Sequence, residues 1–259
     1  MPTIIYPSPI FGPVKSRRFG VSLGINLMPA DGKICTFDCI YCECGFNKDF
    51  RPKQKRPSRE EVSEALETML QKMKADGALP DVLTFAGNGE PTAHPDFASI
   101  IDDTVALRDN YCPQCQITVL SNATMLHKKE VVEALLKVDN NCQKLDTVDN
   151  QYISFLDRPQ SPAYQVDDIV EQLCQFKGKV IIQTMFLDGE YCGKNVCNTG
   201  EEYLIPWIET LKKISPQKVM IYTIDRETPA KGLKKTTHET LDNIAARLAA
   251  ASLPCSVSY

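Results

Sequence analysis

The sequence lacks the features that mark membrane-spanning, secreted and broadly nucleic-acid-coating proteins. Its 259 residues contain no signal-peptide pattern, and no apolar run approaches the roughly eighteen residues of a membrane span. A basic excess is also missing, because the net charge is -4, whereas proteins that coat nucleic acid usually carry a basic domain. We therefore expect a cytoplasmic protein without a membrane segment.

Disulfides are not expected either, although the chain has eleven cysteines. Cytoplasmic cysteines stay reduced or bind metals, and an odd number does not suit a fully paired framework. A hydrophobic content of 43% and a charged content of 24% are ordinary for a soluble globular protein. We expect a single domain over residues 1–259, with an irregular arm at residues 1–19 because this stretch is rich in proline.

The cysteines that are present include a compact motif, Cys35-x-x-x-Cys39-x-x-Cys42, with Tyr41 just before the last thiol. Three thiolates on one short loop suit an iron–sulfur cluster and leave one iron open to another ligand. Structural zinc is an alternative, but it usually has four ligands in spaced pairs, and only Cys39 and Cys42 have that spacing. The third alternative is a set of small buried core residues.

The apolar pattern predicts six strands that alternate with six helices. The predicted strands cover residues 21–27, 82–86, 117–120, 143–148, 180–186 and 218–224. This alternation indicates right-handed crossovers and a parallel sheet with helices outside it. Periodicity does not distinguish a doubly wound sheet from an open barrel. Ser58 and Glu61 predict a capping box at the start of the first helix, and Gly77 ends it.

Polar residues follow the carboxyl ends of these strands, where parallel α/β folds place their binding sites. The cysteine motif follows the first strand, and Gly87-Asn-Gly-Glu-Pro-Thr92 follows the second. The later strands end in the polar residues Ser121, Asn122, Asp146, Gln183, Thr184, Tyr222, Asp225 and Arg226. We expect all of them at one mouth of the sheet.

The two motifs together resemble the signature of the radical S-adenosylmethionine (radical SAM) superfamily. Cys35, Cys39 and Cys42 with Tyr41 match Cys-x-x-x-Cys-x-aromatic-Cys, and the second motif is similar to Gly-Gly-Glu-Pro, with Asn88 as the second residue. Residues 16–45 look most like the branch of tRNA wybutosine-synthesis enzymes and their uncharacterised bacterial relatives. The resemblance implies an α/β fold, a partial (β/α)6 TIM-type barrel with parallel strands.

The resemblance also implies cofactors and their ligands. A [4Fe-4S] cluster on Cys35, Cys39 and Cys42 would leave one iron to S-adenosylmethionine. The cofactor would be held by a loop that glycine allows to come close, and by polar or aromatic side chains at the mouth. These residues are Gly87, Asn88, Gly89, Glu90 and Pro91 in the loop, and Tyr41, Asn122, Asp146 and Gln183 outside it. Polar residues at strand ends also serve as caps or loop hydrogen bonds. His94 could brace the loop or carry a proton.

The implied reaction is reductive cleavage of S-adenosylmethionine to a 5'-deoxyadenosyl radical that abstracts hydrogen from a substrate. An electron donor such as flavodoxin or ferredoxin would be a partner. The substrate stays open among a small molecule, a peptide, a glycyl-radical partner enzyme and tRNA. Basic residues flank the cysteine motif, as a local patch or as a solvated linker: Lys15, Arg17, Arg18, Arg51, Lys53, Lys55, Arg56 and Arg59. A non-catalytic electron-transfer protein is the alternative from another class.

The remaining cysteines do not predict a second cluster. Cys112 and Cys115 have metal-ligand spacing, but they precede the third strand and so fall at the face opposite the mouth. Cys192 and Cys197 lie in the long loop after the fifth strand, and only Cys44 could join them. We expect that loop to act as a substrate lid, because long loops on the active face often do.

Overall fold

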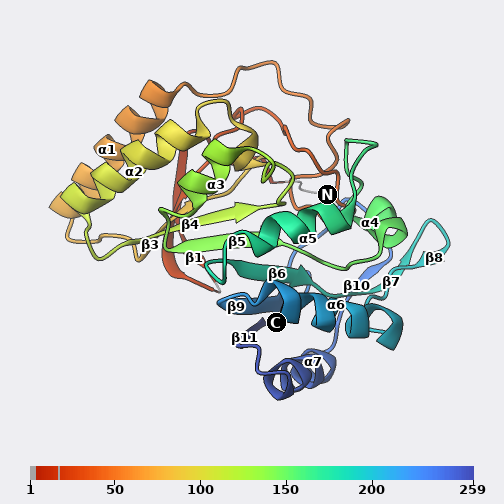
Figure 1. The fold of residues 1–259 in the computed structure, drawn as a ribbon. Helices are drawn as coiled ribbons and strands as arrows, with labels where there is room; N and C mark the ends of the chain where they lie inside the picture. Colours follow the sequence, from red (N-terminus) through yellow and green to blue (C-terminus); the bar gives the residue numbers. More distant parts are fainter. Residues whose placement is uncertain (1–3, 17) are drawn as a thin grey trace.

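The computed structural model describes residues 4–16 and 18–259 (Figure 1). Its large sheet has eight strands in the order β1-β2-β3-β4-β5-β6-β9-β11. They are β1 (Ile10–Ser16), β2 (Gly20–Ile25), β3 (Val82–Phe85), β4 (Gln116–Ser121), β5 (Asn140–Lys144), β6 (Ile181–Met185), β9 (Lys218–Tyr222) and β11 (Cys255–Ser258). Only β1 is antiparallel to its neighbour, and the other pairs are parallel.

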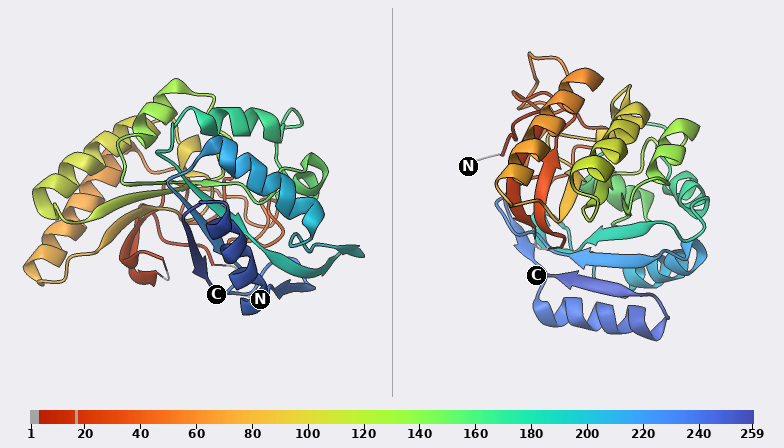
Figure 2. Two further views of the ribbon diagram at one scale, coloured as in Figure 1. Left: turned by 60° about the horizontal axis from the view of Figure 1, so that its bottom comes forward. Right: turned by 90° about the vertical axis from the view of Figure 1, so that its left-hand side faces the viewer.

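Helices follow the strands and lie along the outer face of the curled sheet (Figure 2). They are α1 (Arg59–Ala75), α2 (Phe97–Tyr111), α3 (Lys129–Leu135), α4 (Asn150–Leu156), α5 (Val166–Cys174), α6 (Glu201–Ile214) and α7 (His238–Ala250), with a 3-10 turn η1 (Pro91–Ala93). Because the helices cover the outside of a curled, mostly parallel sheet, the doubly wound alternative is excluded. The predicted partial TIM-type barrel is confirmed.

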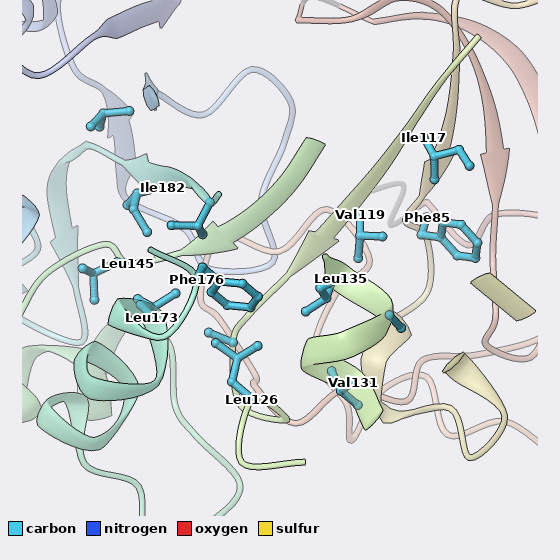
Figure 3. Close-up of a cluster of buried hydrophobic side chains, with 14 of the residues drawn as sticks. Phe85, Ile117, Val119, Leu126, Val131, Leu135, Leu145, Leu173, Phe176 and Ile182 are labelled. Atoms are coloured by element: carbon cyan, nitrogen blue, oxygen red, sulfur yellow. The ribbon is translucent and has the colours of Figure 1, made fainter. Parts of the chain in front are cut away.

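The main core lies between the sheet and these helices (Figure 3). Phe85, Ile117 and Ile182 from the strands pack in one cluster with Leu173 and Phe176. Each of these side chains is at most 1% exposed. The apolar faces of the amphipathic helices are therefore buried on the sheet, as the helical periodicity predicts.

The first helix begins and ends as predicted. The Ser58 backbone amide donates to Glu61 Oε2 at 2.6 Å, and the Glu61 amide donates to Ser58 Oγ at 3.2 Å. These two bonds form the capping box. Gly77 follows the end of the helix with a positive φ of 67°, a conformation that glycine adopts readily.

The prediction of an irregular arm at residues 1–19 is wrong for residues 10–16, which form β1. Gly12 and Pro13 hide this strand in the sequence, because proline cannot donate to a strand ladder. β1 tolerates them as an edge strand with an irregular register between Phe11 and Val14. Gly24 on β2 makes room for the Phe11 ring, which lies 2.1 Å from where a β-carbon would stand.

Three further differences concern polar segments. The fourth strand was predicted at residues 143–148 but is Asn140–Lys144, since its first two residues are asparagines that strand propensity disfavours. The short helix α4 and the terminal strand β11 were not predicted. The loop after the fifth strand contains β7 (Leu187–Tyr191) and β8 (Lys194–Asn195), which form a small sheet with β10 (Leu233–Lys235). No helix in the described part of the chain is long and apolar enough to cross a membrane.

Candidate active site

The cysteine loop (residues 33–45) pairs with the glycine loop (residues 87–91) at the carboxyl edge of the parallel sheet. The Ile34 amide donates to the Asn88 carbonyl at 3.0 Å, and the Glu90 amide donates to the Ile34 carbonyl at 3.2 Å. Ile34 and Gly89 thereby form an isolated parallel bridge. The two motifs therefore form one backbone unit, although they follow different strands.

Glycine is required in the second loop by this pairing. Gly87 and Gly89 have φ values of 129° and 145°, which side chains rarely adopt. A β-carbon on Gly89 would lie 1.8 Å from the Ile34 carbonyl oxygen, and one on Gly87 would lie 2.7 Å from the Asn26 side chain. The close approach that the sequence predicted toward a cofactor is thus made, in this structure, to the cysteine loop.

Asn88 and Glu90 hold the glycine loop in place. The fully buried Asn88 side chain donates to the Pro29 carbonyl at 2.9 Å and the Tyr6 carbonyl at 2.8 Å. Asn88 is not among the described residues with positive φ. Glu90 Oε2 accepts from the Asn122 amide at 2.7 Å, and Oε1 accepts from Thr92. Through these contacts Glu90 anchors the glycine loop.

The three motif cysteines are free, partly buried thiols on the cysteine loop. A tight turn brings two of them together, because the Cys42 amide donates to the Cys39 carbonyl at 3.1 Å. Burial raises the pKa of Cys35 to about 12. Hydrogen bonding from Cys44, with the charge of Lys33, lowers the pKa of Cys42 to about 6, although burial opposes this shift. Across the described residues, no group of three or more histidine, cysteine or acidic side chains is arranged to hold a metal ion.

A buried cation lies among these thiols. The Lys33 side chain is 1% exposed, and its ammonium lies 3.8 Å from Asp38 Oδ1 and donates to the Gly45 carbonyl at 2.7 Å. Burial opposes its charge, but the neighbouring thiol groups, Cys42 foremost, raise the Lys33 pKa. Lys33 therefore places a positive charge beside sulfur ligands that bind metal as anions.

Tyr41 is held by a second buried charge cluster. Its hydroxyl donates to Asp146, and the Lys144 ammonium lies 4.5 Å from the centre of its ring. Lys144 pairs with Asp146 and, at 3.0 Å, with Asp157. Asp146 Oδ1 also accepts from the Met185 amide at 2.9 Å. Because both oxygens of Asp146 already have protein partners, its contacts favour fixing Tyr41 over the predicted contact with the cofactor.

Asn122 and Gln183 also have protein partners. Asn122 Nδ2 donates to Thr36 Oγ1 at 2.8 Å and lies 3.7 Å from Cys35 Sγ. Gln183 Oε1 accepts from the Arg18 guanidinium at 3.1 Å. Asn122 therefore lies next to a motif cysteine, whereas Gln183 lies deeper in the barrel, two residues before the end of β6.

His94 braces the glycine loop, one of its two predicted roles. Its Nδ1 accepts from the Asp96 amide at 3.1 Å, so its Nε2 donates to the Pro57 carbonyl at 2.9 Å. Burial lowers the pKa of His94. Both ring nitrogens are engaged, and the neutral form is the one that these two bonds require.

A cavity of about 740 Å³ lies inside the barrel below the cysteine loop. Tyr41, Cys42, Cys44 and Gly87 form part of its wall. The other predicted cofactor residues stand outside the described lining: Asn88, Gly89, Glu90, Pro91, Asn122, Asp146 and Gln183. The structure thus brings the predicted residues together at one mouth, but most of them support the wall instead of forming it.

Three charged residues of this site were not predicted from the sequence. Lys33 has a detectable signal, a cation two positions before Cys35. Lys144 ends β5, but the shifted prediction of that strand concealed its position. Asp157 follows α4, which was not predicted. Their roles depend on contacts between distant segments, which composition and periodicity do not reveal.

Cys44 lies beside Cys42, whereas the other cysteines that the sequence singled out lie apart from the motif. Cys112 and Cys115 are buried next to the start of β4, at the opposite end of the strand from the mouth. Cys192 is exposed between β7 and β8, and Cys197 is partly buried. Arg17 of the predicted basic patch lies outside the described residues. Arg59 pairs with Asp103 at 2.6 Å.

Comparison with known proteins identifies the family. The chain is 31% identical over 242 residues to a UPF0026 protein, MJ1312, of Methanocaldococcus jannaschii, covering 91% of this chain and 70% of the relative. Streptococcus suis SuiB bound to S-adenosylmethionine has a similar fold, with a TM-score of 0.64 and 16% identity over 91% of this chain and 50% of SuiB. TYW1 with a lysine–pyruvate adduct gives a TM-score of 0.62 and 16% identity over 88% of this chain and 73% of TYW1.

The chain thus spans about half the length of SuiB. A family model described as the radical SAM superfamily matches residues 31–191, a range that includes both the cysteine loop and the glycine loop. This match covers more than half of the chain, and the fold agrees with it. The protein therefore belongs to the radical SAM superfamily; the members of this superfamily are enzymes, and membership implies an iron–sulfur cluster and S-adenosylmethionine.

Proposed function

We propose that this protein holds a [4Fe-4S] cluster on Cys35, Cys39 and Cys42 and uses it to cleave S-adenosylmethionine reductively. The observation that carries the proposal is the backbone pairing of Ile34 with the glycine loop above a cavity of about 740 Å³. Cys42 and Gly87, one residue from each motif, line this cavity, which is large enough for a small ligand.

The donor set fits a cluster better than a single ion. In a cubane cluster each thiolate binds a different iron, so the sulfurs do not have to converge on one point. The three thiols are free and partly buried, and Lys33 supplies a cation that compensates for thiolate charge. Three protein ligands leave one iron for S-adenosylmethionine.

When bound, the cluster and S-adenosylmethionine would supply the electron transfer and the 5'-deoxyadenosyl radical. The protein supplies orientation and the wall of the cavity. Gly87 and Tyr41 would contact the cofactor from the cavity wall, and Asp146 fixes the Tyr41 hydroxyl. Leu120 and Met185 add apolar surface to the same cavity, which would limit the access of water to the reacting atoms.

The other predicted cofactor residues would act indirectly, by positioning the residues that line the cavity wall. Asn88, Gly89 and Glu90 keep the glycine loop against the cysteine loop, and Pro91 begins the 3-10 turn η1 that follows. Three residues at or near the ends of later strands would position the site from behind the cavity wall. Asn122 lies beside Cys35, Asp146 beside Tyr41 and Gln183 beside Arg18. An external reductant, such as flavodoxin or ferredoxin, would deliver the electron.

Lys144 is not suited to form a lysine–pyruvate adduct such as the one named for TYW1. A Schiff base requires a neutral amine. Lys144 pairs with two buried carboxylates, Asp146 and Asp157, and these charges raise its pKa well above the ordinary value even though burial opposes the shift. Its ammonium therefore stays charged and holds Tyr41 in place.

Formation of 5'-deoxyadenosine tests the proposal. Wild-type protein is reconstituted anaerobically with iron and sulfide, reduced with dithionite and incubated with S-adenosylmethionine. We expect 5'-deoxyadenosine from the wild type and from a Cys174→Ala control, whose thiol lies near Lys213 on the outer helices. Cys35→Ala, Cys39→Ala and Cys42→Ala should each give none. Iron uptake without any product would instead support the electron-transfer alternative.

A further inference from the structure

We propose that the barrel cavity accepts a substrate that carries a carboxylate or phosphate group, and that Arg18 binds this anion. The inference rests on the proposed function, since it concerns the substrate of the same site. Arg18 lies in the turn between β1 and β2 and forms part of the wall of the 740 Å³ cavity. The roles proposed for the cysteine loop and the glycine loop do not explain why an arginine lies in this cavity wall.

The turn that carries Arg18 folds into the barrel. Phe19 packs against Cys142, Ile181 and Met220, which come from β5, β6 and β9 and form a cluster separate from the main core. Ser16 Oγ accepts from the amides of Arg18 and Phe19, each at 3.2 Å. The backbone of Arg18 is therefore fixed, and Phe19 anchors the turn inside the barrel.

The Arg18 guanidinium is held in the cavity by neutral groups. One nitrogen donates to Gln183 Oε1 at 3.1 Å, and the guanidinium carbon lies 4.9 Å from the centre of the Tyr222 ring. A guanidinium has five N–H donors, so most of them are left over after these contacts. Within residues 4–16 and 18–259, no carboxylate forms an ion pair with Arg18.

Three other cations near the site differ from Arg18, because each has an acidic partner. Lys144 pairs with two aspartates, Lys33 lies 3.8 Å from Asp38, and Arg226 pairs with Glu43 at 2.7 Å. The Arg18 guanidinium has no acidic partner among the described residues and is oriented by the Gln183 amide and the Tyr222 ring. Such a guanidinium suits bidentate hydrogen bonding to a carboxylate or phosphate. Ser22 and Thr84 add hydroxyl groups to the same wall, bonded to each other at 2.8 Å.

The cavity lining also determines how such a substrate would be oriented. Arg18 and Phe19 line it on the side of the β1–β2 turn, whereas Cys42, Cys44 and Gly87 line it on the side of the cofactor loops. A molecule bound by its anion at Arg18 would extend toward the cofactor loops. Hydrogen would then be abstracted from a carbon at the end of the substrate far from its anionic group, and not from the carbon that carries this group.

Ligand-observed NMR tests this inference with three methyl probes on the anaerobically reconstituted holoenzyme. Acetate carries its methyl group on a carboxylate, and methylphosphonate carries it on a phosphate-like anion. Acetamide is the uncharged analogue of acetate. We expect saturation transfer from protein to at least one anionic probe and none to acetamide. The responding probe identifies the anion as carboxylate-like or phosphate-like. A signal from acetamide equal to that of both anions would overturn the inference.

Variants assign the binding to Arg18. Arg18→Gln should reduce the transfer at least tenfold, and Arg18→Lys, which keeps the charge but loses the fork, should reduce it several-fold. Lys15→Met is the control, because Lys15 is an exposed cation on the same wall and its loss should keep the signal. Unchanged binding in Arg18→Lys and Arg18→Gln, or equal losses in Lys15→Met, would contradict the assignment.

The visible cluster absorbance and thermal melting of each variant report on folding. If Arg18→Gln does not fold, the Arg18→Lys variant and the three probes still decide the outcome. Because this experiment reads binding and not turnover, its failure leaves the 5'-deoxyadenosine result intact. Conversely, a protein that binds acetate through Arg18 but never cleaves S-adenosylmethionine would contradict only the proposed function.

Discussion

Gly89 is the position where one added methyl group should disturb the site most. In Gly89→Ala the new carbon would stand 1.8 Å from the Ile34 carbonyl oxygen, so the two loops must separate. Separation breaks two backbone hydrogen bonds, of 3.0 and 3.2 Å, worth about 1 kcal/mol each. The φ of 145° adds strain of about 1–3 kcal/mol. We expect a total loss of about 3–5 kcal/mol in the free energy of unfolding.

Thermal melting and iron content measure this effect. For a chain of this size, each kcal/mol corresponds to about 2–4 °C in Tm, so Gly89→Ala should melt roughly 10 °C below the wild type and retain little iron. Gly77→Ala is a matched control, because Gly77 also has positive φ but has no atom within 4 Å of an added β-carbon. It should lose about 1–2 kcal/mol from backbone strain alone and keep its iron. Equal Tm and iron content in the two variants would refute the pairing argument.

Three other changes test separate parts of the structure. His94 has a pKa lowered from 6.5 by burial, so the neutral ring contributes stability that is present above about pH 6.5 and is lost as the pH falls through the lowered value. His94→Gln should therefore make the Tm less sensitive to acid in that window, and an unchanged pH profile would contradict the stabilising role of the buried neutral ring. Phe176→Ala should cost about 3–5 kcal/mol in urea unfolding, because Phe176 is 1% exposed in the core; a cost below about 1 kcal/mol would show that this packing is loose. Ser58→Ala should cost about 1 kcal/mol through loss of the capping box, and no change in Tm would mean that Glu61 alone caps α1.

The fold was predictable where apolar residues follow a regular period. The segments at Val82–Phe85 and Lys218–Tyr222 were placed within two residues of their observed ends, because buried parallel strands are continuous apolar runs. Prediction failed for β1, where Gly12 and Pro13 interrupt the run, and for β5, which begins with two asparagines. In both, pairing with a neighbouring strand outweighs local propensity.

The site was predictable in its motifs but not in its contacts. Spacing identified the cysteines and the glycine loop, and strand order placed them at one edge. The sequence could not show that Gly89 faces Ile34, or that Asp146 is bound by Tyr41 and Lys144. These contacts join residues far apart in the chain, so they depend on the three-dimensional arrangement of the strands.

The number of iron atoms bound per chain tests the central claim most directly. Anaerobically reconstituted wild type should contain about four irons per chain, as one cubane cluster requires. A variant with Cys35, Cys39 and Cys42 all changed to alanine should contain almost none. Binding of zinc without iron by the wild type would contradict the account, and about eight irons in the wild type with about four left in the triple variant would contradict a single cluster.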